Sequence, residues 1–141
     1  MFQITSIKNG LVIDHIKAGK GIKIFNYLNL ENEKNQVTLI INADSKILGK
    51  KDIIKIENIR EINYTVLSIL SPSITINEVR NGEINKKFKP KLPTRVLNIL
   101  KCNNPRCITV DEKYVNHSFK LVNLKECTYR CEYCDNITKL L

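Results

Sequence analysis

The placement of cysteines constrains this chain more than any other feature of its sequence. All five, Cys102, Cys107, Cys127, Cys131 and Cys134, lie in the last 40 of its 141 residues. Cys102 and Cys107 enclose four residues, Cys131 and Cys134 enclose two, and 23 residues separate these pairs. Each short loop can present two thiolates to one ion, and four sulfur ligands suit tetrahedral Zn²⁺. The spacing therefore predicts one structural zinc ion per chain; the alternative is an iron–sulfur cluster, which four thiolates can also hold.

A closed shell of four cysteines leaves no coordination position for water or substrate, so the predicted zinc stabilises a fold and performs no hydrolysis. Residues 94–141 are only 48 in number and can bury little apolar area, which is close to the size at which a bound metal is needed. We therefore expect metal loss to unfold them. For Cys127 we expect a small buried apolar residue on a strand in preference to a fifth ligand or a reactive thiol.

The sequence also indicates the compartment and the charge of a partner. No apolar run approaches the roughly 20 residues that span a bilayer, and residues 1–5 lack the basic and then apolar pattern of an export signal. We therefore expect a cytoplasmic protein with no membrane partner, whose thiols stay reduced. The formal charge of +9 favours an anionic partner, such as a nucleotide, a nucleic acid or an acidic protein surface.

The first 93 residues alternate strand-like and helix-like patterns. Apolar spacing predicts helices from residue 21 to 30 and from 59 to 70, the second ending before Pro72. Asn81-Gly82 predicts a tight hairpin turn. The predicted strands cover residues 2–7, 11–16, 36–41, 52–57, 74–79 and 83–88, with a turn at 45–51. From residue 11 to 79 the order is βαββαβ, which predicts an α+β, ferredoxin-like domain.

Two prolines in residues 89–93 indicate a domain boundary, so we predict domains over 1–93 and 94–141. In the second domain, short strands are predicted at residues 95–100, 114–117, 119–124 and 136–140. The prediction for this part is a small antiparallel β domain that binds zinc.

The sequence lacks the phosphate-binding loop, nucleophile elbow and metalloprotease motifs, and it has only two histidines, His15 and His117. Asp14 and His15 are adjacent, but a regular strand would point them to opposite faces, so we interpret them as a surface pair and not a catalytic dyad. The chain is therefore expected to bind and not to catalyse. Asp14, His15, Lys55 and Lys87 could hold a nucleotide, the carboxylate accepting from ribose and the ammonium groups neutralising phosphates. The alternative for Lys50, Lys51, Lys86 and Lys87 is a solvated basic surface.

Residues 10–16 (GLVIDHI), residues 49–58 (GKKDIIKIEN) and the cysteine spacing together resemble the regulatory chain of aspartate carbamoyltransferase. The resemblance covers nearly the whole chain. It implies a non-catalytic regulatory subunit that binds ATP or CTP, sometimes with UTP, and allosterically modulates a separate catalytic chain in pyrimidine biosynthesis. It also implies a nucleotide-binding domain that pairs with its copy in a regulatory-chain homodimer, and a zinc domain that contacts the catalytic chain.

The resemblance further implies which residues bind the nucleotide. Asp14 and Lys55 would contact ribose, His15 and Lys87 the phosphates, and backbone groups near Ile7 and Ile84 the base. Two residues depart from the family pattern: Thr5 stands where the family has a carboxylate, and Gly82 stands where it has an aromatic side chain. Both positions influence which nucleotide base is preferred. The full set of implied nucleotide-binding residues is Ile4, Ile7, Asp14, His15, Lys51, Ile53, Lys55, Asn77, Val79, Ile84 and Lys87.

The alternative from another class is a zinc-ribbon protein that binds nucleic acid, which the charge and the cysteine pairs would suit. However, residues 94–141 carry 8 basic and 5 acidic side chains, a modest excess of +3. They also lack the stacking aromatics of an RNA-recognition pattern. The sequence therefore favours a regulatory chain with no nucleic-acid partner.

Overall fold

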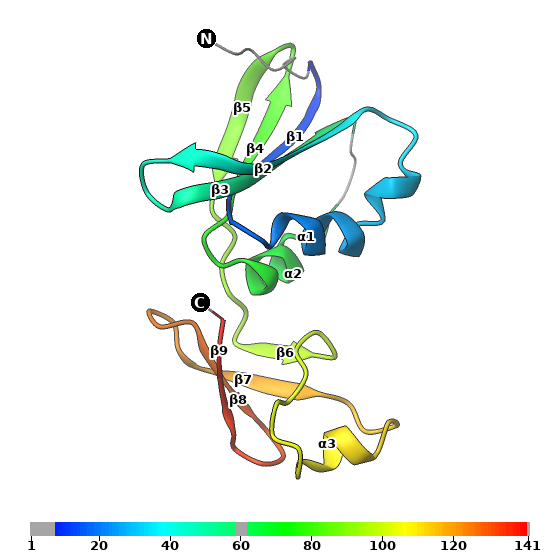
Figure 1. The fold of residues 1–141 in the computed structure, drawn as a ribbon, viewed down its shortest axis with the longest axis vertical. Helices are drawn as coiled ribbons and strands as arrows, with labels where there is room; N and C mark the ends of the chain where they lie inside the picture. The colour runs from blue at the N-terminus through cyan, green and yellow to red at the C-terminus, as the bar shows by residue number, and fades with distance from the viewer. Residues whose placement is uncertain (1–7, 59–61, 141) are drawn as a thin grey trace. The chain divides into compact units, whose positions relative to one another are not determined.

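A computed structural model describes residues 8–58 and 62–140, which divide into two compact units after Pro90 (Figure 1). Ile4, Thr5, Ile7 and the start of the second predicted helix lie outside the described residues. No helix within the described ranges is long and apolar enough to cross a membrane. The domain bounds 1–93 and 94–141 stay a prediction.

The first unit is built on one antiparallel sheet with strand order β2-β3-β1-β4-β5. Its strands are β1 Gly10–Lys17, β2 Val37–Ser45, β3 Gly49–Glu57, β4 Thr75–Arg80 and β5 Glu83–Phe88. β3 lies between β1 and β2, and β1 lies between β3 and β4, so the chain forms two interleaved split βαβ units. The ferredoxin-like prediction is confirmed. β5 extends the sheet through the predicted turn at Asn81 and Gly82, both of which have positive φ.

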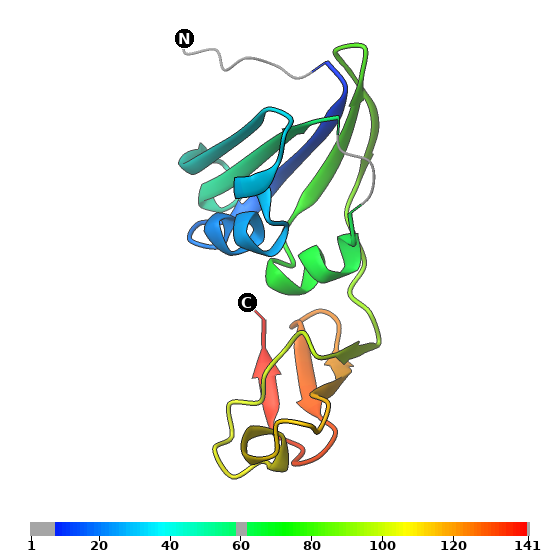
Figure 2. The ribbon, with the colours of Figure 1, turned by 90° about the vertical axis from the view of Figure 1, so that its right-hand side faces the viewer.

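Helices α1 (Gly21–Tyr27) and α2 (Tyr64–Leu70) lie on the same face of this sheet (Figures 1 and 2). α1 is shorter than predicted because Asn29 takes a left-handed φ of 54° and a 3₁₀ turn, η1 (Leu30–Asn32), follows. α2 begins at Asn63, whose side chain accepts a hydrogen bond from the Val66 N–H, and ends before Pro72 as predicted. The buried core between helices and sheet is Leu11, Ile13, Ile16, Ile24, Leu30, Ile54, Ile56, Leu67, Ile74 and Ile76.

The second unit is a four-stranded antiparallel sheet with order β6-β7-β8-β9. Its elements are β6 Arg95–Leu97, α3 Ile108–Asp111, β7 Ser118–Asn123, β8 Thr128–Cys131 and β9 Ile137–Lys139. The strand predicted at 114–117 is wrong, since these residues form a turn and an irregular segment. The short β8 and α3 were not predicted. Tyr129 of β8 is fully buried and donates a 2.6 Å hydrogen bond to the Pro93 carbonyl, which anchors the start of this unit.

Candidate functional site

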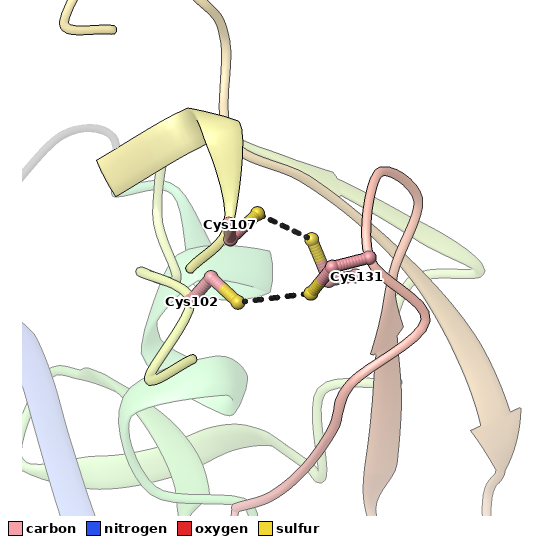
Figure 3. A group of neighbouring side chains, drawn as sticks. Cys102, Cys107 and Cys131 are labelled. Carbon is pink, nitrogen blue, oxygen red and sulfur yellow. Dashed lines mark hydrogen bonds between the residues drawn. The ribbon is translucent and has the colours of Figure 1, made fainter. Parts of the chain in front are cut away.

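The four paired cysteines meet at one point of the second unit, although they come from separate segments. Cys102 follows β6, Cys107 precedes α3, Cys131 ends β8, and Cys134 lies in the turn before β9. The sulfurs of Cys102 and Cys134 are 3.5 Å apart and those of Cys107 and Cys131 are 3.6 Å apart (Figure 3). All four sulfurs lie within 4.8 Å of one another. Tetrahedral Zn–S bonds of about 2.3 Å place sulfurs about 3.8 Å apart, so this cluster fits one such ion.

Hydrogen bonds within the two cysteine loops, and one hydroxyl beside a sulfur, hold these loops in place. Thr109 Oγ1 lies 3.0 Å from the Cys107 sulfur. The Asn104 carbonyl accepts from the Cys107 N–H, and its side-chain oxygen accepts from the Arg106 N–H. In the second loop the Asp135 N–H donates to the Cys131 carbonyl. Such contacts orient ligands around a metal before it binds.

Glu132 ties the second cysteine loop to the sheet. Its carboxylate accepts a 2.8 Å hydrogen bond from Arg95 Nε of β6 and a 2.8 Å hydrogen bond from Ser118 Oγ of β7. Its backbone N–H also donates to the Ser118 carbonyl at 2.9 Å. Glu132 is not predictable from the sequence, because an acidic side chain between two cysteines carries no local sign of its distant partners.

The thiols of the cluster do not ionise alike. Burial raises the pKa of Cys102 to about 12. Burial also opposes ionisation of Cys134, but hydrogen bonds from the Asn104 side chain, the Asn136 N–H and Cys102 outweigh it and lower that pKa to about 7. A metal ion binds thiolates, so binding must displace protons from the more weakly acidic thiols.

Cys127 is not one of the clustered cysteines. It is buried, as expected, and its thiol lies 3.7 Å from the Leu124 carbonyl. Its predicted position on a strand is wrong, because it occupies the turn before β8 with a φ of 55°.

The candidate nucleotide residues of the first unit lie on the face of its sheet away from α1 and α2, here called the outer face. Thr38, Lys55, Val12, Asn77 and Lys87 are paired in that order across all five strands. Directly paired residues of an antiparallel sheet project from the same face. The row therefore brings Lys55 and Lys87 to either side of Asn77. The side-chain oxygen of Asn77 is buried and has no hydrogen-bond partner among the described residues.

An irregularity in β1 brings Asp14 and His15 together beside this row. Ile13 pairs with Ile54 and Ile16 with Asp52, so Asp14 and His15 together lie opposite Ile53. His15 has a φ of 55°, and this β-bulge redirects its side chain. Its ring Nδ1 lies 4.0 Å from the Asp14 carboxylate and 3.1 Å from Thr75 Oγ1. The expectation that a regular strand separates Asp14 from His15 is therefore wrong.

Lys51 completes this group. Its ammonium lies 2.9 Å from the Asp14 carboxylate, and both side chains are largely buried, at 16% and 21% exposure. Burial raises the pKa of Asp14, but hydrogen bonds from the Lys51 side chain and the His15 N–H outweigh it and lower the pKa below its ordinary value of 3.8. The alternative of a solvated surface lysine is wrong for Lys51, whereas Lys50 is exposed and pairs with Asp44.

The outer face thus gathers every predicted nucleotide residue within the described ranges: Asp14, His15, Lys51, Ile53, Lys55, Asn77, Val79, Ile84 and Lys87. Val79 pairs with both Gly10 and Ile84, which places Val79 and Ile84 together at one end of the face, whereas Ile53 lies opposite Asp14 and His15. The predicted Ile4 and Ile7 lie outside the described residues.

Asp52 supports this face from behind and was not recognised in the sequence. It is fully buried on the helix side, and its carboxylate accepts from the backbone N–H groups of Gly19, Gly21 and Asn42 at 3.1, 2.9 and 3.1 Å. It thereby fastens the turn before α1 and an irregularity in β2 to the strand that carries Lys51 and Ile53.

Comparisons with known proteins agree over both units. The family model for the allosteric domain of the aspartate carbamoyltransferase regulatory chain matches residues 2–91, and the model for the metal-binding domain of that chain matches residues 94–140.

Curated relatives are similar over almost their full length, and each is named aspartate carbamoyltransferase regulatory chain. The relative from Clostridium botulinum (strain Hall) is 56% identical over 137 residues, covering 97% of this chain and 94% of the relative. The relative from Clostridium tetani is 52% identical, covering 100% and 99%. The relative from Bifidobacterium longum is 43% identical, covering 98% and 99%.

Proposed function

Because the chain belongs to the family of aspartate carbamoyltransferase regulatory chains, we propose that its outer face binds ATP and CTP, and also UTP, as allosteric effectors. The chain is a non-catalytic subunit with an allosteric and a metal-binding domain. Its relatives are named regulatory chains of aspartate carbamoyltransferase, and we assign to this chain the modulation of that enzyme in pyrimidine biosynthesis. The match of both family models favours this role over the nucleic-acid alternative.

The row across the outer face carries the nucleotide assignment. Lys55 and Lys87 supply positive charge on either side of Asn77, whose buried oxygen is an acceptor without a partner among the described residues. Buried polar groups are rarely left without hydrogen bonds. The unpaired Asn77 oxygen, in a row that also carries two lysines, therefore supports the proposal that a polar ligand binds here. Asp14 accepts from ribose, and His15 with Lys87 contacts the phosphates.

We assign the four-cysteine cluster to one structural Zn²⁺ per chain. Zinc suits four thiolates, and a closed thiolate shell leaves it no open position for catalysis. The ion would hold the two cysteine loops and so preserve the surface through which the second unit contacts the catalytic chain. The nucleotide unit, in turn, pairs with its copy from another regulatory chain in the cytoplasm.

In this mechanism the effector biases an assembly with two states. Nucleotide bound on the outer face stabilises one state, and the zinc unit transmits that bias through its contact with the catalytic chain. Such coupling free energies are typically about 1–3 kcal/mol. No residue of this chain takes part in bond making or breaking.

Isothermal titration of the full chain with ATP and with CTP tests the nucleotide site. Lys55→Ala and Lys87→Ala should each weaken binding by about ten- to a hundredfold, because a charge-assisted contact to phosphate or ribose contributes about 1.5–3 kcal/mol. Lys86→Ala is the matched control. Lys86 neighbours Lys87 on β5 but lies on the helix side, with its ammonium 4.9 Å from the centre of the Phe88 ring. Wild-type affinity in both test variants, or equal losses in all three, would contradict the assignment.

A further inference from the structure

Three hydroxyl side chains alternate from the end of α2 to the first residue of β4, and all three are linked to β1 in or next to its bulge. Ser71 Oγ accepts from the Lys17 N–H at 3.1 Å. Ser73 Oγ donates to the His15 carbonyl at 2.7 Å. Thr75 Oγ1 lies 3.1 Å from His15 Nδ1. The segment therefore follows β1 through the place where its regular pairing is interrupted.

The first two hydroxyls form a directed chain. Ser71 Oγ and Ser73 Oγ are 3.3 Å apart. A serine hydroxyl has one proton, and Ser73 uses its proton on the His15 carbonyl, so Ser71 must be the donor between the two. The chain runs from the Lys17 N–H through Ser71 and Ser73 to the His15 carbonyl, and it bridges both sides of the bulge.

A bulge of this kind needs such support. His15 has a left-handed φ of 55°, a conformation that costs a residue with a side chain about 1–3 kcal/mol. The Asp14 carboxylate stabilises it from one side by accepting from the His15 N–H at 2.6 Å. Ser73 stabilises it from the other side through the His15 carbonyl. The peptide groups that flank His15 are thus held by two side chains.

We propose that Ser73, with Ser71 behind it, is a positioning residue that fixes the β1 bulge and thereby sets the affinity of the outer face for nucleoside triphosphates. This inference rests on the proposed function. Ser73 touches the backbone of His15 and acts through it, so its effect is on the orientation of the His15 ring and the Asp14 carboxylate. Without the hydroxyl, the bulge adopts other geometries for part of the time. The His15 ring and the Asp14 carboxylate are then less often oriented to bind the nucleotide, and the affinity falls.

The test uses the full chain with three substitutions. Ser73→Ala removes the hydroxyl, Ser73→Thr retains it, and Thr65→Ala removes an exposed hydroxyl from α2 as a control. We expect the dissociation constant of ATP or CTP to rise about tenfold in Ser73→Ala, and to stay within about twofold of wild type in Ser73→Thr and Thr65→Ala. In the ligand-free chain, the NMR signals of the His15 ring should shift in Ser73→Ala only.

Two results would overturn the inference and leave the proposed function standing: wild-type affinity in Ser73→Ala, or equal loss in Ser73→Thr. If the wild-type chain binds neither ATP nor CTP, the proposed function and the affinity part of the inference both fail. The His15 signals of the ligand-free chain then decide separately whether Ser73 positions the ring, and unchanged signals refute that as well.

Discussion

Asp14 and Asp52 lie near each other in the sheet, but their side chains project from opposite faces. Asp14, on the outer face, pairs with Lys51 at 2.9 Å and accepts from the His15 N–H. Asp52, on the helix side, accepts only from backbone N–H groups within the described part of the chain. The first arrangement is suited to exchanging partners with a ligand, and the second is suited to holding the fold.

The lowered pKa of Asp14 predicts a contribution to stability that depends on pH. A carboxyl with a lower pKa in the folded chain binds fewer protons there than when unfolded. Its contribution is therefore present above the ordinary value of 3.8 and is lost as the pH falls through the lower folded value. Urea unfolding at pH 7 and pH 3 should show a smaller loss of stability on acidification for Asp14→Asn than for wild type. An equal loss would contradict this account.

Asp52→Asn should destabilise the first unit by about 2–3 kcal/mol. The amide has one oxygen in place of two, so at least one of the three backbone N–H groups loses its acceptor, and bonds to a charged group contribute about 1.5–3 kcal/mol. Urea denaturation measures the change. Asp44→Asn is the control: this carboxylate is 94% exposed and pairs with Lys50 at the surface, so its loss should cost less than about 0.5 kcal/mol. Similar costs in the two variants would be inconsistent with an anchoring role.

At the scale of elements, the sequence predicts the first unit better than the second. Alternation within β3 puts Ile54 and Ile56 in the core and Ile53 and Lys55 outside, and a pattern of that kind is visible in a single segment. β8 has only four residues, three of them buried, and it alternates poorly. It exists because the cysteine loops and Tyr129 fix it to distant segments, which no local pattern reveals.

The candidate sites also contain residues that the sequence predicts and residues that it does not. Cysteine spacing predicted the metal cluster, and the family resemblance predicted the outer-face residues. The β1 bulge, Asp52, Glu132 and Ser73 could not be predicted. Each depends on the register between strands or on partners tens of residues away, such as Ser73 and His15, which are 58 residues apart. Register is a property of the assembled sheet.

Metal removal should unfold the second unit selectively. Its buried apolar side chains are few, and the cluster joins four of its segments. After chelation, NMR signals of residues 94–140 should collapse to unfolded positions while those of β1 to β5 persist. Cys107→Ser should reduce bound zinc, measured by atomic emission, whereas Cys127→Ser should leave the stoichiometry at one ion per chain. A folded second unit after complete chelation, or equal zinc loss in both variants, would refute the structural role of the cluster.

At the scale of the whole molecule, the proposed coupling must act in both directions. If ATP changes the affinity of the catalytic chain for a substrate analogue, the analogue must change the affinity for ATP by the same factor, because both report one coupling free energy. For couplings of about 1–3 kcal/mol the factor is about 5–150. Titrating the assembled complex with each ligand in the presence and absence of the other measures both factors. The isolated regulatory chain is the control, since the analogue should not alter its ATP affinity. Unequal factors would show that the titrations had not reached binding equilibrium. No change in either affinity, with assembly verified by sedimentation, would remove the allosteric role while leaving nucleotide binding intact.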